Sequence, residues 1–84
     1  MQAYKPRGTC SREIDFDVRD GKIGEVRFVG GCPGNALGLA ALLHGMSVDE
    51  AIARLDGIRC GRRSTSCPDQ LAQALKQYKA AAGE

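Results

Sequence analysis

Residues 14–29 carry the pattern of a β-hairpin, and this pattern constrains the fold more than any other stretch of the chain. Apolar and charged side chains alternate over positions 14–18, which is typical of a strand with one buried face. A turn is expected at residues 20–22, and residues 25–29 form the returning strand. The sequence therefore predicts a two-stranded antiparallel hairpin near the N-terminus.

The length of the turn sets the register of this hairpin. A three-residue turn pairs Arg19 with Ile23, and apolar residues then face each other across the two strands: Ile14 opposite Phe28, and Phe16 opposite Val26. Continued to the open end of the hairpin, the same register brings Cys10 opposite Cys32. We therefore expect the first two cysteines to lie close together.

Three helices are expected after the hairpin. The first, over residues 36–44, is apolar on almost all sides, which predicts a central, buried helix. The second begins at the capping box Ser47 to Glu50, and the third runs from about Cys67 to Lys79 with Ser66 as its N-cap. The element order ββααα predicts an α+β fold, and 84 residues provide for one domain over residues 1–84.

Four cysteines occur in turn-like contexts: Cys10, Cys32, Cys60 and Cys67. No apolar run is long enough to span a bilayer, and the N-terminus lacks the apolar stretch of a signal peptide, which predicts a cytoplasmic protein. In that compartment metal or redox chemistry is commoner than paired disulfides. Four cysteines on glycine-rich loops can form a tetrahedral thiolate site, and Zn²⁺ is its commonest occupant. The leading interpretation is a zinc site made by all four cysteines.

Other interpretations of the cysteines stay open. An iron–sulfur cluster also takes four thiolates, although the sequence lacks a closely spaced run of three cysteines. Buried thiols without any metal, and disulfides, are further alternatives. A thiol-redox role needs an attacking thiolate and a resolving thiol. Cys67 and Cys60 meet that need, because a helix N-terminus and the nearby Arg62 and Arg63 favour a thiolate.

The segment before the third predicted helix also has the composition of an anion site: Arg62, Arg63, Ser64, Thr65 and Ser66. Arginines, hydroxyls and helix N–H groups together can bind the phosphate of a nucleotide. The alternative is that the arginines are solvated and only offset the charge of a thiolate site. A net charge of +2 gives no strong signal for nucleic-acid binding.

Three blocks of the sequence resemble the TSCPD-domain family: Tyr4-x-Pro6-Arg7-Gly8-Thr9-Cys10-Ser11, Gly30-Gly31-Cys32-x-Gly34-Asn35 and Cys60-Gly61-x-x-x-Thr65-Ser66-Cys67-Pro68-Asp69-Gln70. The resemblance covers nearly the whole chain and indicates a small, free-standing member. A related domain lies near the C-terminus of prokaryotic, mainly adenosylcobalamin-dependent, ribonucleotide reductases, where it is thought to bind metal or nucleotide.

The resemblance therefore implies a link to ribonucleotide reduction, with a reductase or another protein as partner. It does not imply catalysis by this chain alone, because the barrel and radical machinery of a reductase cannot fit in 84 residues. The open edges of a two-stranded hairpin are also compatible with a homodimer.

Overall fold

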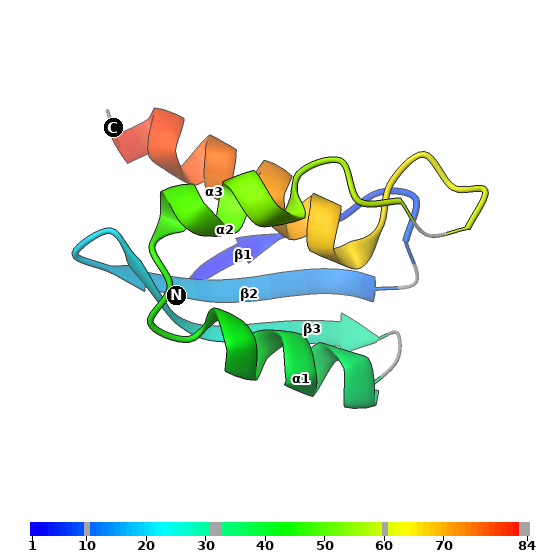
Figure 1. Ribbon diagram of the computed structural model, residues 1–84, viewed down its shortest axis with the longest axis horizontal. Helices are drawn as coiled ribbons and strands as arrows, with labels where there is room; N and C mark the ends of the chain where they lie inside the picture. The colour runs from blue at the N-terminus through cyan, green and yellow to red at the C-terminus, as the bar shows by residue number, and fades with distance from the viewer. Residues whose placement is uncertain (10, 31–32, 60, 83–84) are drawn as a thin grey trace.

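The computed structural model describes residues 1–9, 11–30, 33–59 and 61–82. Within these ranges the elements follow one another as β1 (Gln2–Tyr4), β2 (Ser11–Arg19), β3 (Lys22–Gly30), α1 (Pro33–Leu43), α2 (Val48–Leu55) and α3 (Cys67–Ala82). α1 lies beside β3, and α2 lies beside α3 (Figure 1). The predicted α+β class with three helices is confirmed.

The sheet of the described residues has three strands, so the prediction of a two-stranded hairpin is wrong. The additional strand, β1, pairs antiparallel with β2, placing Tyr4 opposite Ile14 and Gln2 opposite Phe16. Three residues are too few for an alternating pattern to stand out in the sequence. This pairing makes β2 the central strand, and it brings Tyr4 against the hydrophobic core.

The predicted register between β2 and β3 is confirmed in the middle of the strands, where Ile14 pairs with Phe28 and Phe16 with Val26. At the turn it is wrong, because Arg19 pairs with Lys22. The connecting residues Asp20 and Gly21 have φ angles of 52° and 74°, as a two-residue hairpin turn requires. A β-bulge between the turn and Val26 absorbs the extra residue and restores the apolar pairing.

The register also changes at the open end of the two strands. Ser11 pairs with Gly30, and the shift falls between Ser11 and Glu13. Ile14 and Phe16 face inward, and side chains alternate between the two faces of a strand. With a constant register, Ser11 would therefore lie on the charged outer face of the sheet. The shift turns Ser11 inward instead, where it is buried. The predicted pair Cys10 and Cys32 lies outside the described residues.

α1 is not the buried, central helix that its composition predicts. Leu43 is buried, but Leu37 and Leu42 on the outer face of the helix are 72% and 76% exposed. Such a composition is typical of a buried helix, but α1 packs beside the edge strand β3, and its far side is left exposed. The ring Nδ1 of His44 lies 3.0 Å from the carbonyl oxygen of Gly24 and ties the end of α1 to the bulge in β3.

The central helix is α3, which contributes four fully or nearly fully buried apolar residues: Leu71, Ala72, Ala74 and Leu75. They join one cluster with buried residues of β2, β3, α1 and α2. The rings of Phe16 and Tyr78 meet edge to face, with centroids 6.2 Å apart, and connect the middle of β2 to α3. The opposite face of the sheet carries charged side chains. The result is one sheet face covered by helices and one facing solvent.

Both predicted N-caps are confirmed. The Ser47 hydroxyl accepts a hydrogen bond from the N–H of Glu50 at 3.1 Å, and the Ser66 hydroxyl accepts one from the N–H of Asp69 at the same distance. α3 therefore begins where the sequence predicts, and it continues to Ala82. No helix in the part of the chain that the structure describes is both long and apolar enough to cross a membrane.

The two neighbouring leucines at the end of α1 provide a test of its position. Leu43→Ala should lower the free energy of unfolding by about 2–4 kcal/mol, because the buried side chain leaves a cavity. Leu42→Ala should change it by less than about 0.5 kcal/mol, because that side chain is largely exposed. Urea unfolding of both variants measures the difference, and equal losses of stability would contradict the position of α1 described above.

Candidate functional site

The first turn of α3 and the residues before it contain most of the buried polar side chains of the described chain: Thr65, Ser66, Asp69 and Gln70. Their exposed fractions lie between 4% and 8%. Polar side chains at this depth are stable only when they are hydrogen-bonded. Their partners show what this segment holds in place.

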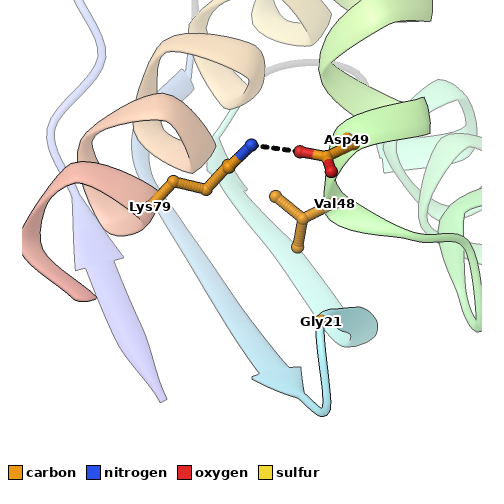
Figure 2. Close-up of a pocket in the computed structure, with 4 residues that line it drawn as sticks. All are labelled: Gly21, Val48, Asp49 and Lys79. Atoms are coloured by element: carbon orange, nitrogen blue, oxygen red, sulfur yellow. Dashed lines mark hydrogen bonds and ion pairs between the residues drawn. The ribbon is translucent and has the colours of Figure 1, made fainter. Parts of the chain in front are cut away.

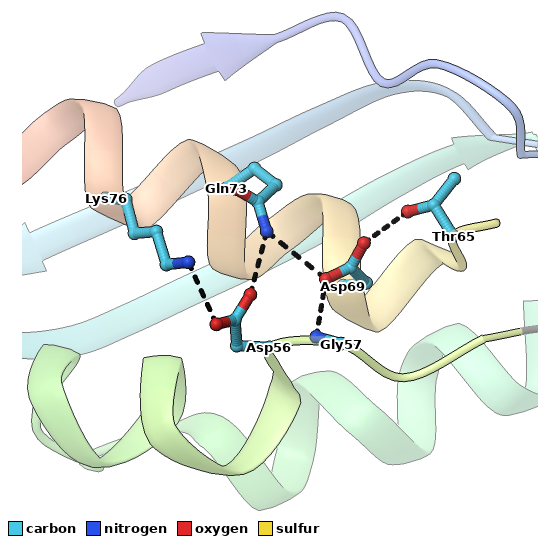
Figure 3. Close-up of polar contacts among 6 residues, drawn as sticks. All are labelled: Asp56, Gly57, Thr65, Asp69, Gln73 and Lys76. Carbon is cyan, nitrogen blue, oxygen red and sulfur yellow. Dashed lines mark hydrogen bonds and ion pairs between the residues drawn. The ribbon is translucent and has the colours of Figure 1, made fainter.

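Asp69 is the centre of these contacts (Figure 3). Its carboxylate accepts hydrogen bonds from the Thr65 hydroxyl, from the N–H of Gly57 at 2.7 Å and from the side-chain amide of Gln73 at 3.2 Å. The hydrogen bond from Thr65, followed by those from Gly57 and Gln73, lowers the pKa of Asp69 although its burial acts in the opposite direction. Asp69 is therefore a carboxylate at neutral pH, and it joins the end of α2 to α3.

Gln70 connects α3 to the segment that follows β1. Its side-chain oxygen accepts hydrogen bonds from the Tyr4 hydroxyl at 3.3 Å and from the N–H of Arg7 at 3.0 Å. Its side-chain amide donates to the Thr65 hydroxyl at 2.9 Å. Thr65 thus accepts from Gln70 and donates to Asp69, so both functions of its hydroxyl are used within the fold.

Ser66 holds the loop between α2 and α3. Its hydroxyl donates to the carbonyl oxygen of Ile58 at 2.7 Å while it caps α3. Together with the bond from Gly57 to Asp69, this contact fixes the chain just before residue 60. The hydroxyls of Thr65 and Ser66, both predicted to bind an anion, are therefore directed into the fold.

Cys67 begins α3 and is partly exposed. Its sulfur lies 3.0 Å from the hydroxyl oxygen of Ser11, which is 5% exposed at the start of β2. The other predicted metal ligands, Cys10, Cys32 and Cys60, lie outside the described residues. Among the residues that the structure does describe, no three potential metal ligands come together.

Of the predicted anion-binding residues, Arg62, Arg63 and Ser64 are exposed in the loop before α3. One contact joins this loop to the N-terminal segment, since the Arg63 guanidinium donates to the carbonyl oxygen of Gly8 at 3.4 Å. A pocket at the opposite end of the molecule, near the turn after β2, is lined by Gly21, Val48, Asp49 and Lys79 (Figure 2). Asp49 and Lys79 form an ion pair there.

Sequence reasoning missed two residues of the site. Ser11 is buried because of the register shift before Glu13, and no local pattern predicts such a shift. The sequence does contain a signal for Gln70, because it lies in the first turn after the N-cap of α3, where polar side chains often bond to the residues before the helix. Its partners Tyr4 and Arg7 are more than sixty residues away in the chain, so only the folded structure identifies them.

The close approach of the N-terminal segment to Thr65 can be tested at Gly8. Its φ angle is +73°, and a Cβ atom there would lie 3.0 Å from the Thr65 methyl group, which cannot turn away because its hydroxyl is bonded on both sides. Gly21 has nearly the same φ angle, +74°, but nothing within 4 Å of a Cβ atom. Gly21→Ala should therefore destabilise by about 1 kcal/mol, the conformational cost alone. Gly8→Ala should cost about 1–2 kcal/mol more, and equal losses in thermal unfolding would exclude the contact.

The fold and the site define a small α+β domain in which a buried polar motif begins a helix and holds two distant segments beside a cysteine. The family model of the TSCPD domain matches residues 2–79, so the chain belongs to the TSCPD domain family. No curated protein and no solved structure matches the chain.

Proposed function

We propose that the chain is a cytoplasmic metal-binding module in which Cys10, Cys32, Cys60 and Cys67 hold one Zn²⁺ ion, and that it serves as an accessory or interaction domain. The supporting observation is that four helices and strands begin or end at the same end of the molecule. β2 and α3 begin at the same end of the molecule at which β3 ends and α1 begins (Figure 1). Each cysteine lies at, or within a few residues of, one of these ends or the loop that Ser66 holds.

The hydrogen bonds of the buried polar motif, which consists of Thr65, Ser66, Asp69 and Gln70, support the same proposal. Gln70 fixes the segment that leads to Cys10, and Ser66 and Asp69 fix the loop that leads to Cys60. Loops that carry metal ligands need such fixed positions, because hydrogen bonds from the residues around a metal site orient its ligands. In this proposal the polar residues of the motif position the loops, and the cysteines supply the sulfur ligands.

Ser11 has a defined role in this arrangement. Zinc, when bound, would cross-link four loops through thiolate sulfurs and so add to the stability of a small core. A thiolate has no proton to donate, so the hydroxyl of Ser11 must then donate to the sulfur of Cys67. Such a bond favours the charged form of the sulfur, as does the N-terminus of α3.

Elemental analysis of protein purified without added metal, together with a count of reactive thiols, tests the zinc site. We expect about one zinc per chain and protection of the cysteines from alkylation. Cys67→Ser should lower the metal content, whereas the matched control Ser64→Ala, in the same loop but exposed, should not. An iron signal with visible absorbance would favour a cluster instead. Metal-free protein with four reactive thiols would contradict the proposal.

A second candidate function is the binding of a nucleotide phosphate. The exposed guanidinium groups of Arg62 and Arg63 and the hydroxyl of Ser64 favour it, since they precede a helix N-terminus. Thr65 and Ser66 would contribute little through their hydroxyls, which are bonded within the fold. Titration with a nucleoside triphosphate should shift the backbone amide signals of residues 62–66. No shift at millimolar nucleotide would exclude this candidate.

The resemblance to the C-terminal domain of ribonucleotide reductases supports an accessory role beside such an enzyme. In this alternative, in which the two thiols hold no zinc, Cys60 and Cys67 would reduce a disulfide of the reductase and become a disulfide themselves, which an added dithiol reductant would reduce again; the chain would have no catalysis of its own. The turnover of a purified reductase with and without the chain tests this proposal. A role in thiol exchange predicts that Cys67→Ser abolishes any stimulation, and a rate independent of the chain would contradict it.

A further inference from the structure

Basic side chains gather at the end of the molecule where α3 begins. Five arginines lie there, in two segments that are distant in sequence, and all five are exposed: Arg7, Arg12, Arg59, Arg62 and Arg63. Described contacts bring the two segments together. The N–H of Arg7 donates to Gln70 in the first turn of α3, and the Arg63 side chain donates to Gly8. Ser11, next to Arg12, contacts Cys67.

Most acidic residues of the chain lie elsewhere. Segments 1–12 and 57–68 contain none of the ten aspartates and glutamates, and of the two that follow these segments closely, Glu13 and Asp69, the second is buried and hydrogen-bonded within the fold. The ion pairs found among the described residues use other basic side chains: Arg19, Arg27, Arg54, Lys76 and Lys79. A zinc ion with four thiolates would carry a net charge of −2, which is smaller in size than the five positive charges of the arginines. The positive charge of this end is therefore larger than the proposed zinc site requires.

We propose that this arginine surface, formed by Arg7, Arg12, Arg59, Arg62 and Arg63, binds an acidic segment of a partner protein. Guanidinium groups match carboxylates with two parallel hydrogen bonds, and they lose less hydration than lysine when they are buried in an interface. Ile58, adjacent to Arg59, is 42% exposed and offers an apolar contact within the basic surface. The partner segment is thus rich in aspartate and glutamate and carries one apolar side chain.

The charge of the remaining molecule favours an acidic protein segment over nucleic acid. Outside the two basic segments, ten acidic residues outnumber six lysines and arginines. A long polyanion would meet repulsion as soon as it extended beyond the basic end, whereas a short acidic segment would not. The separation of charge also orients the molecule as it approaches a partner, with its cysteine-bearing end foremost. The proposal uses no cysteine and is independent of metal binding.

Fluorescence anisotropy of the full chain with a labelled ten-residue peptide of glutamate and aspartate containing one leucine tests the proposal. We expect saturable binding that Arg62→Glu/Arg63→Glu weakens by about tenfold or more. The matched control Arg19→Glu/Arg27→Glu makes the same change in net charge at exposed positions on β2 and β3, and it should weaken binding by less than about threefold through long-range charge alone. Raising the salt concentration should weaken binding to the unmodified chain.

Three results would overturn the proposal: no binding at about 0.1 M salt, equal weakening by the two double variants, or tighter binding of a single-stranded oligonucleotide of the same length and charge. The last would assign the surface to nucleic acid. Circular dichroism checks that each variant is folded, and metal content is measured on the same samples. A failure of the arginine surface is then distinguishable from a failure of the zinc site.

Discussion

Removal of the proposed zinc ion under reducing conditions is expected to destabilise the chain more than any single substitution in its core. Structural zinc in small domains contributes about 10–16 kcal/mol of apparent binding free energy, which in such proteins is largely folding free energy. A domain of 84 residues has only a small core to compensate for that loss. Thermal unfolding with and without a strong zinc chelator measures the effect, and we expect a large decrease in Tm or complete unfolding.

Two controls make this result specific. Adding zinc back should restore the original transition, and Ser64→Ala should respond to the chelator as the unmodified chain does. Cys67→Ser should already be destabilised and should respond less. An identical transition before and after chelation, in protein shown by elemental analysis to have lost its metal, would contradict a stabilising site.

Loss of the Asp69 carboxylate is expected to be the most damaging change among the polar residues of the motif. Asp69→Ala leaves the buried Thr65 hydroxyl and the partly buried Gly57 N–H without their acceptor. Unsatisfied buried donors cost about 1–3 kcal/mol each, so we expect a loss of about 3–5 kcal/mol. Asp69→Asn should lose less, about 2–3 kcal/mol, because one amide oxygen still accepts. Urea unfolding gives both values.

Asp49→Asn is the matched control for Asp69. Its carboxylate is exposed and pairs with Lys79 at the surface (Figure 2), where an ion pair contributes at most about 1 kcal/mol. If Asp49→Asn and Asp69→Asn were equally destabilising, the hydrogen bonds around Asp69 would have no special role. The control also reports any general effect of removing one negative charge.

The lowered pKa of Asp69 makes a separate prediction about acid. A carboxylate whose pKa is lower in the folded state stabilises the fold fully above its unfolded pKa, which for aspartate is near its ordinary value of 3.8. That contribution is lost as the pH falls through the folded pKa. The unmodified chain should therefore lose stability below about pH 4 more steeply than Asp69→Asn. Asp56, whose pKa is also lowered by Lys76 and Gln73, contributes a slope of the same sign in both proteins.

These contacts account for the polar side chains at the start of α3. Within the described structure, Thr65, Ser66, Asp69 and Gln70 bond to one another or to distant backbone and side-chain groups. Their hydroxyl, carboxylate and amide groups are satisfied by the fold. Cys67, partly exposed beside Ser11, is the residue of this segment that the proposed function assigns to the zinc site.

Features that depend on neighbouring residues can be predicted from the sequence. The N-cap residues Ser47 and Ser66 indicated the starts of α2 and α3, and alternation indicated the central register of β2 and β3, because these signals act over a few residues. The turn was predicted one residue too long, since a bulge in β3 hides the difference from any pairing argument based on apolar residues alone.

Tertiary structure alone decided the rest. β1 exists because β2 offers an edge to pair with, and α1 lies at the periphery because α3 fills the central position. The inward turn of Ser11 and the bonds from Tyr4 and Arg7 to Gln70 join residues more than fifty positions apart. No local pattern contains such contacts, because they depend on which surfaces meet when the chain closes on itself. The same closure brings the arginines of two separate segments to one end of the molecule.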